Sequence, residues 1–101
     1  MNIEQKVKEI VHRYDENAQV ILFGSRARGD WNEESDWDFL ILTDKNDTED
    51  LFKKIRNDVI LEVELPSLNV VQTIIRNRRI WEEDYWITPL YNNVKEEGIL
   101  I

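Results

Sequence analysis

Two short apolar runs, each joined to a small polar motif, constrain the fold of this chain more than any other feature. The first run, residues 19–23, ends at Gly24-Ser25, and the second, residues 37–42, begins within the Asp-Trp-Asp triplet at 36–38. Short apolar runs bounded by turn-forming residues are typical of buried strands. The sequence therefore predicts two strands that bracket a glycine turn and a pair of carboxylates.

Helical periodicity surrounds these strands. The predicted elements are a helix over 3–14, a strand over 19–23, a short helix over 25–30, a strand over 37–42, a helix over 48–61, a strand over 68–75, and helices over 78–85 and 89–97. Asp47 or Thr48 can cap the helix at 48–61. Pro66 is expected to end any helix or strand that precedes it. The order αβαβαβαα predicts an α/β fold, a small mixed sheet flanked by helices, in one domain over residues 1–101.

Composition narrows the classes of protein that fit. No apolar stretch approaches the ~20 residues that cross a bilayer, and the first residues do not resemble a signal peptide, so we expect a cytoplasmic protein that does not enter a membrane. The net charge of −8 disfavours duplex DNA as a partner, because such binding depends on basic residues that release counterions. The same charge suits a basic partner protein or divalent cations.

The two carboxylates at the start of the second strand predict a metal site. Asp36 and Asp38 are one residue apart, and side chains on a strand alternate between faces, so both point to the same side. Like charges held this close repel each other unless a cation lies beside them. Mg²⁺ prefers such oxygen ligands and commonly bridges protein carboxylates and substrate phosphates. A lone pair of this kind could equally be the solvated face of an edge strand.

The glycine turn supplies candidate ligands for phosphate. Gly24 permits a close approach of the backbone, Ser25 offers a hydroxyl, and the backbone N–H groups at a helix start attract anions. Arg26 and Arg28 can add charge-assisted hydrogen bonds, or can be ordinary surface residues. Trp31 lies in the polar loop beside the site and is a candidate for base stacking or for a partner contact.

Gly24-Ser25, ten intervening residues and the triplet at 36–38 together resemble the GSx10DxD signature of the polymerase-β-like nucleotidyltransferases. The string Leu-Phe-Gly-Ser-Arg-Ala-Arg-Gly-Asp at 22–30 resembles in particular their small prokaryotic branch, the minimal nucleotidyltransferases. Neither half of the signature is specific alone. Their combination between two apolar strands is specific, and the resemblance is concentrated over residues 20–42.

The resemblance implies transfer of a nucleoside monophosphate, typically AMP, from ATP or another nucleoside triphosphate to a hydroxyl group. It implies that Asp36 and Asp38 hold two Mg²⁺ ions, or Mn²⁺ in their place, and that Gly24 and Ser25 bind the β- and γ-phosphates. Many small members of the family are paired with a HEPN protein in toxin–antitoxin modules, where some attach AMP to a tyrosine of the toxin. An acidic antitoxin suits that role.

The chain departs from the family pattern at a third carboxylate, which the family places on the strand after the second long helix. Alignment to that strand puts Asn69 there as a metal ligand, and asparagine cannot act as a carboxylate base. Either catalysis is weakened or lost, or Glu62 or Glu64 reaches the metals from just upstream. The alternative function is therefore a nucleotide-binding or partner-binding antitoxin module; a primer-extending polymerase is disfavoured by the short, acidic chain.

Overall fold

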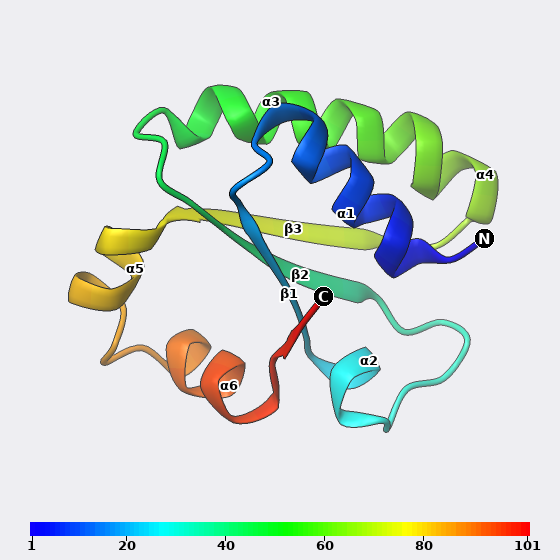
Figure 1. The fold of residues 1–101 in the computed structure, drawn as a ribbon. Coiled ribbons are helices and arrows are strands. Elements are labelled where there is room, and N and C mark those ends of the chain that lie inside the picture. Colours follow the sequence, from blue (N-terminus) through cyan, green and yellow to red (C-terminus); the bar gives the residue numbers. More distant parts are fainter.

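A four-stranded sheet with the strand order β3-β2-β1-β4 lies at the centre of the computed structural model, which describes residues 1–101 (Figure 1). The strands are β1 (Gln19–Phe23), β2 (Trp37–Thr43), β3 (Val71–Asn77) and β4 (Ile99–Leu100). β1 pairs antiparallel with both β2 and β4, whereas β2 and β3 are parallel. The sheet is therefore mixed, as the sequence predicts.

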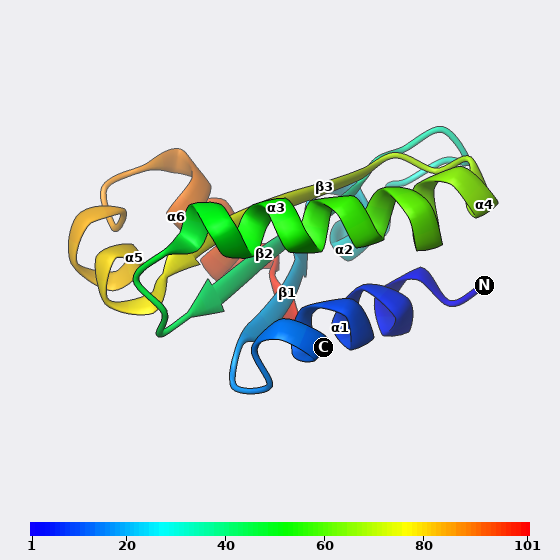
Figure 2. The ribbon, with the colours of Figure 1, turned by 90° about the horizontal axis from the view of Figure 1, so that it is seen from above.

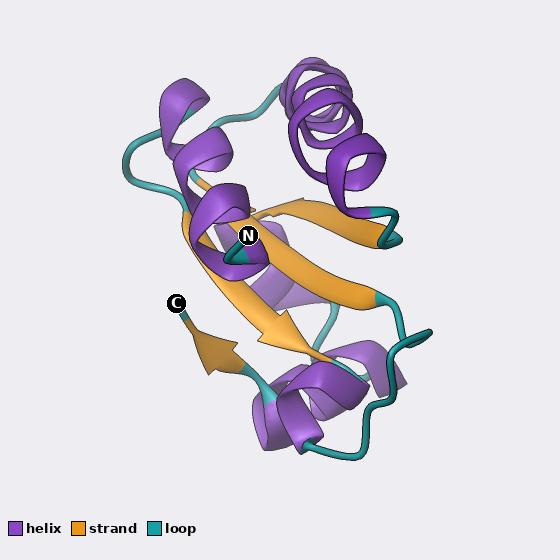
Figure 3. Cartoon of the chain, turned by 90° about the vertical axis from the view of Figure 1, so that its right-hand side faces the viewer, coloured by secondary structure: helices purple, strands orange, loops and turns teal.

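Helices cover both faces of this sheet. They are α1 (Ile3–Tyr14), α2 (Ser25–Arg28), α3 (Thr48–Val59), the π-helical segment η1 (Ile60–Glu64), α4 (Leu65–Ser67), α5 (Arg78–Asp84) and α6 (Pro89–Glu97). Figure 3 shows α1 and α3 on one face and α5 and α6 on the other, and Figure 2 looks onto the layer of α1 and α3. None of these helices combines the length and the apolar character that crossing a bilayer requires.

β2 is buried on both faces, which explains why its sequence is continuously apolar rather than alternating. Phe39 and Ile41 pack into the cluster formed with α1 and α3. Leu40 and Leu42 point the other way and pack with Trp81 of α5. The same alternation continues through residues 36–38 at the start of β2. It therefore determines the face of the sheet on which each aspartate of the Asp-Trp-Asp triplet lies.

The helix boundaries at both ends of the chain confirm the predictions over 3–14 and 89–97. Thr88 caps α6 through its side chain, and Pro89 occupies the first helical position, where its missing N–H costs nothing. Of the two candidate caps of α3, the structure selects Asp47, whose side chain accepts a hydrogen bond from the Asp50 amide.

The prediction that Pro66 ends the preceding helix is wrong. Helical backbone continues from α3 through the π-helical segment to Ser67, and it ends at Leu68, which adopts a left-handed conformation with φ of 59°. Proline has no N–H, and its ring crowds the carbonyl four residues back in a regular α-helix. The wider π turn directly before Pro66 changes that spacing and accommodates the ring.

As a consequence the third strand starts later than expected. Asn69 lies in the connection after the helix, where its amide N–H donates to Ser67 Oγ at 3.2 Å. The first hydrogen bond to β2 runs from the Trp37 N–H to the Val70 carbonyl, 2.9 Å, and β3 begins at Val71. The expected strand over 68–75 is thus displaced toward the C-terminus, and Asn69 is not part of it.

The segment after the last helix is a strand rather than a tail. β4 pairs with the outer edge of β1, with Leu22 opposite Ile99, and the Ile101 N–H donates to the Val20 carbonyl at 3.0 Å. A two-residue strand is too short to show periodicity, and its partner lies far away in the sequence. Local pattern alone therefore gives no signal for it.

We predict that Ile55→Ala, on the buried face of α3, lowers the free energy of unfolding by about 2–5 kcal/mol, because it leaves a cavity in the core. Urea denaturation measures this change. Lys53→Ala, on the solvent face of the same helix, is the matched control, and we expect it to change the value by less than about 0.5 kcal/mol. Equal effects would show that the face assigned to the core is wrong.

Candidate active site

The glycine turn and the second aspartate are brought into direct contact by the pairing of β1 with β2. Phe23, the last residue of β1, lies opposite Asp38, so the turn that follows passes beside this carboxylate. Gly24 has φ of 77°, and a Cβ placed on it would lie 2.3 Å from Asp38 Oδ2. Only glycine fits here, because both the backbone conformation and the approach of the carboxylate exclude a side chain.

Asp36 and Asp38 lie on the face of the sheet that also carries Leu40, as period-two alternation requires. Gln72 of β3 lies opposite Asp38 in the parallel ladder and therefore projects from the same face. Its Nε2 donates a hydrogen bond to Asp36 Oδ2 at 3.2 Å. The polar group that the fold places beside the two carboxylates is thus the amide of Gln72.

Negatively charged groups outnumber positively charged groups around Asp38. Burial raises the pKa of Asp38 above its ordinary value, and the negative charges of Asp36 and Glu97 raise it further, while Arg28 opposes them. Hard oxygen ligands under mutual repulsion suit Mg²⁺, which would relieve the repulsion. The chain has no cluster of three or more histidine, cysteine or acidic residues that could hold a metal, so any such ion would need further ligands from substrate or water.

Arg26 is engaged inside the protein. Its guanidinium carbon lies 4.5 Å from the ring centroids of both Trp31 and Trp37, and its Nη2 donates to the Ser35 carbonyl at 3.1 Å. Such a cation–π arrangement stabilises the loop between α2 and β2. The sequence suggested Arg26 for a phosphate contact and Trp31 for base stacking. In the structure both side chains stabilise the loop that leads to Asp36.

Arg28 faces a carboxylate that the sequence did not suggest. Its Nη1 donates to both carboxylate oxygens of Glu97, at 3.1 and 3.2 Å, and its Nε donates to Asp30 at 3.3 Å. These hydrogen bonds raise the pKa of Arg28. Glu97 is the last residue of α6, and no motif in the sequence marks it as a functional residue.

The backbone of the turn retains unpaired donors. The Ala27 and Arg28 N–H groups both donate to the Gly24 carbonyl at 3.0 Å, which leaves the N–H groups of Ser25 and Arg26 without an acceptor in α2. They lie directly after Gly24 and hence beside Asp38. The turn therefore offers N–H donors next to a carboxylate pair that needs a cation, an arrangement that complements a metal-bound polyphosphate.

The structure changes the interpretation of the missing third carboxylate. Asn69 is outside β3, and its side chain donates to the Ser67 carbonyl at 3.4 Å rather than to the aspartate pair. Glu62 binds Arg13 and Lys6, and Glu64 binds Arg56 and the Val71 amide, so neither serves the site. The residue of β3 that lies beside the pair is Gln72, three positions after Asn69, because the preceding helix is longer than the sequence predicted.

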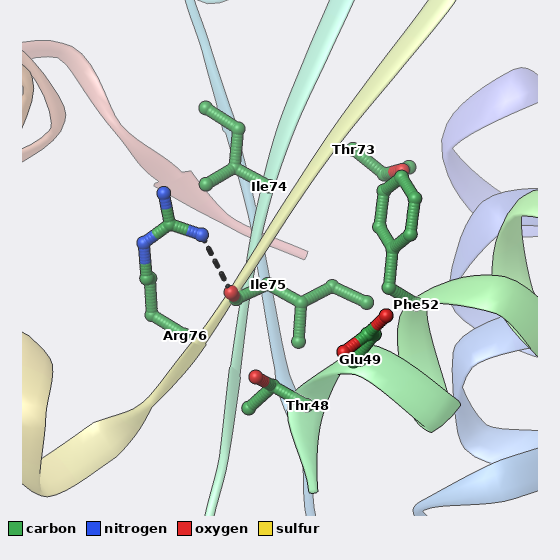
Figure 4. Close-up of a pocket in the computed structure, with 7 residues that line it drawn as sticks. All are labelled: Thr48, Glu49, Phe52, Thr73, Ile74, Ile75 and Arg76. Carbon is green, nitrogen blue, oxygen red and sulfur yellow. Dashed lines mark hydrogen bonds between the residues drawn. The ribbon is translucent and has the colours of Figure 1, made fainter.

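A separate groove of about 340 Å³ follows the outer edge of β3 next to α3 (Figure 4). Thr73, Ile75 and Arg76 line it from β3, and Glu49 and Phe52 line it from α3. It contains a single carboxylate and no glycine turn, so it lacks the ligands for a metal-bound phosphate. The carboxylate pair beside Gly24 remains the better candidate for an active site.

Two comparisons with known proteins agree with this geometry. The sequence model of the family described as a nucleotidyltransferase domain matches residues 3–101. The chain is also 33% identical over 104 residues to a protein of Methanocaldococcus jannaschii named "Putative protein adenylyltransferase", and the alignment covers 97% of this chain and 96% of that relative. Both similarities therefore include the whole sheet and the residues that form the site.

We predict that Gly24→Ala lowers the free energy of unfolding by more than Gly29→Ala does. Both glycines have positive φ, but Gly29 has the left-handed helical conformation, in which alanine is strained by roughly 1–2 kcal/mol, whereas Gly24, with φ of 77° and ψ of −162°, lies in a region open essentially to glycine alone. Only at Gly24 does the added Cβ also meet a carboxylate oxygen, whereas nothing lies within 4 Å at Gly29. Urea denaturation of both variants measures the combined effect of backbone strain and of the contact with Asp38, and equal losses would contradict both.

Proposed function

Because this chain belongs to the nucleotidyltransferase domain family, we propose that it transfers AMP from ATP to a hydroxyl group of a partner protein. The observation that carries the proposal is the placement of Asp36 and Asp38 beside the Gly24 turn. The relative from Methanocaldococcus jannaschii, whose name specifies protein adenylyl transfer, supports both the nucleotide and the protein acceptor.

In this proposal each part of the site has one task. Asp36 and Asp38 hold Mg²⁺, and the N–H groups that begin α2 contact the terminal phosphates. The bound metal would neutralise the triphosphate oxygens and stabilise charge on the leaving pyrophosphate. The acceptor oxygen forms a bond to the α-phosphorus while the bond between that phosphorus and the pyrophosphate oxygen breaks, and the proton of the acceptor hydroxyl passes to water.

Gln72 supports a second candidate function. It occupies the strand position beside the aspartates, and an amide can neither take a proton from the acceptor hydroxyl nor add negative charge to a metal site. A chain with glutamine at this position would bind nucleotide but catalyse its transfer slowly or not at all. The second candidate is therefore a slow or inactive nucleotide-binding module that acts by binding its partner.

The acidic charge bears on the kind of partner. A net charge of −8 favours association with a basic protein, and the minimal nucleotidyltransferases that the chain resembles are often paired with HEPN toxins. We propose a protein of that type as the acceptor or as the bound partner. Co-purification of the chain with such a protein, followed by mass spectrometry for AMP on its tyrosines, separates transfer from simple binding.

We predict that the protein binds a non-hydrolysable ATP analogue only when Mg²⁺ is present, and that Asp36→Ala with Asp38→Ala abolishes this binding. The reason is that the nucleotide would be held largely through the metal on these carboxylates. Isothermal titration calorimetry measures the affinity. Asp44→Ala, which removes an exposed carboxylate just beyond the opposite end of β2, is a control that should leave the affinity unchanged. Absence of binding by the parent would refute nucleotidyl transfer by the chain alone.

We predict that Gln72→Asp tightens Mn²⁺ binding about tenfold and accelerates pyrophosphate release from ATP, because it adds a carboxylate beside Asp36. Electron paramagnetic resonance follows Mn²⁺, and a coupled assay follows pyrophosphate. Asn69→Asp is the matched control, since Asn69 lies outside the strand and should have little effect. A gain from Asn69→Asp in place of Gln72→Asp would show that the alignment, not the structure, locates the missing ligand.

A further inference from the structure

Glu97 connects the last helix to the candidate active site by three hydrogen bonds. Its Oε1 accepts one from the Gly24 N–H at 3.0 Å, and both of its carboxylate oxygens accept from Arg28 Nη1. The Glu97 side chain is only 17% exposed, whereas Asp30, the other acidic partner of Arg28, is 63% exposed. The less exposed carboxylate, that of Glu97, is therefore the stronger anchor of this arginine.

The pairing of β4 with β1 explains how Glu97 reaches the turn. Leu22 lies opposite Ile99 in this antiparallel pair, so continuing the register places Glu97 opposite Gly24, just beyond the end of the ladder. The N–H of Gly24 has no backbone acceptor from β4 there, and the Glu97 carboxylate replaces it. Gly98 allows the backbone to run from α6 into β4 close to the preceding helical turn, because a Cβ at this position would lie 2.4 Å from the Val94 carbonyl oxygen.

The Gly24 turn is consequently held from two sides. Asp38 approaches the glycine Cα from β2, and Glu97 binds its N–H from the side of β4. Glu97 also sets the direction of the Arg28 guanidinium, which is otherwise a half-exposed side chain on the short helix α2. Both the backbone donors after Gly24 and the nearby cation thus depend on one residue of α6.

We infer that Glu97 is a positioning residue for nucleotide binding: it holds the Gly24 turn and the Arg28 guanidinium in place to receive the triphosphate. This inference rests on the proposed function. Without Glu97 the Gly24 N–H loses its acceptor, and Arg28 keeps only its exposed contact with Asp30. A carboxylate that instead competed with phosphate for these donors would have the opposite effect, since its removal would tighten binding.

The test is calorimetric titration of the full chain with Mg²⁺ and the non-hydrolysable ATP analogue. We expect Glu97→Ala to weaken the affinity about tenfold and Glu97→Gln about threefold, because glutamine keeps an acceptor for Gly24 but not the charge facing Arg28. Glu96→Gln, which neutralises the exposed neighbouring carboxylate, should leave the affinity unchanged. In an Arg28→Gln background, Glu97→Gln should have little further effect, because its partner is already absent.

Thermal denaturation and the titration stoichiometry distinguish positioning from general support of the fold. A purely structural role would lower the melting temperature or the fraction of binding-competent protein but leave the dissociation constant of the folded molecules unchanged, and that result would overturn the inference. Tighter binding by Glu97→Gln would overturn it in favour of competition. If the parent chain fails to bind nucleotide, the proposed function itself is wrong. If the parent binds and the Glu97 variants bind equally well, only the inference about Glu97 is wrong.

Discussion

The contact between the backbone of Gly24 and the carboxylate of Asp38 is the constraint on which the site depends. It exists because β1 and β2 pair antiparallel with Phe23 opposite Asp38, and because the first residue after β1 has no Cβ. A slip of one residue in this register would move both aspartates to the opposite face of the sheet, among the apolar side chains packed under α1 and α3. The buried residues of β2 prevent such a slip, so the core and the site share one register.

The charges near this contact are distributed so that acidic groups exceed the available cations. Arg26 is held between two tryptophans, and Arg28 is shared between Asp30 and Glu97. Burial raises the pKa of Asp38, and the charges of Asp36 and Glu97 raise it further, while Arg28 only partly offsets them. A divalent cation that brings a polyphosphate with it would satisfy both this repulsion and the N–H groups of the turn. The local electrostatics thus agree with the reaction that family membership indicates.

In the function that we propose, the amide of Gln72 would weaken catalysis without preventing nucleotide binding. The features that would bind phosphate and metal come from β1, α2 and β2, and they are all present. The strand position beside the aspartates comes from β3, and there the side chain is an amide, whereas the resemblance to the family leads us to expect an acid. Since the two functions are carried by different elements, one can be weakened while the other persists. This division accounts for the two candidate functions that the same fold supports.

The sequence by itself determined most of the helices and the first two strands, together with the motif that joins them. The apolar runs of β1 and β2, the helices at 3–14 and 89–97, and the spacing of Gly24 from Asp36 and Asp38 are local patterns, governed by periodicity, capping and the alternation of side chains. Tertiary structure decided the start of β3 and the contacts between segments that are far apart in the sequence. The π turn before Pro66 moved the start of β3 and put Gln72 rather than Asn69 beside the aspartates, and the β1–β4 pairing brought Glu97 to Gly24. These contacts join residues tens of positions apart, and no local pattern records which segments a folded sheet places side by side.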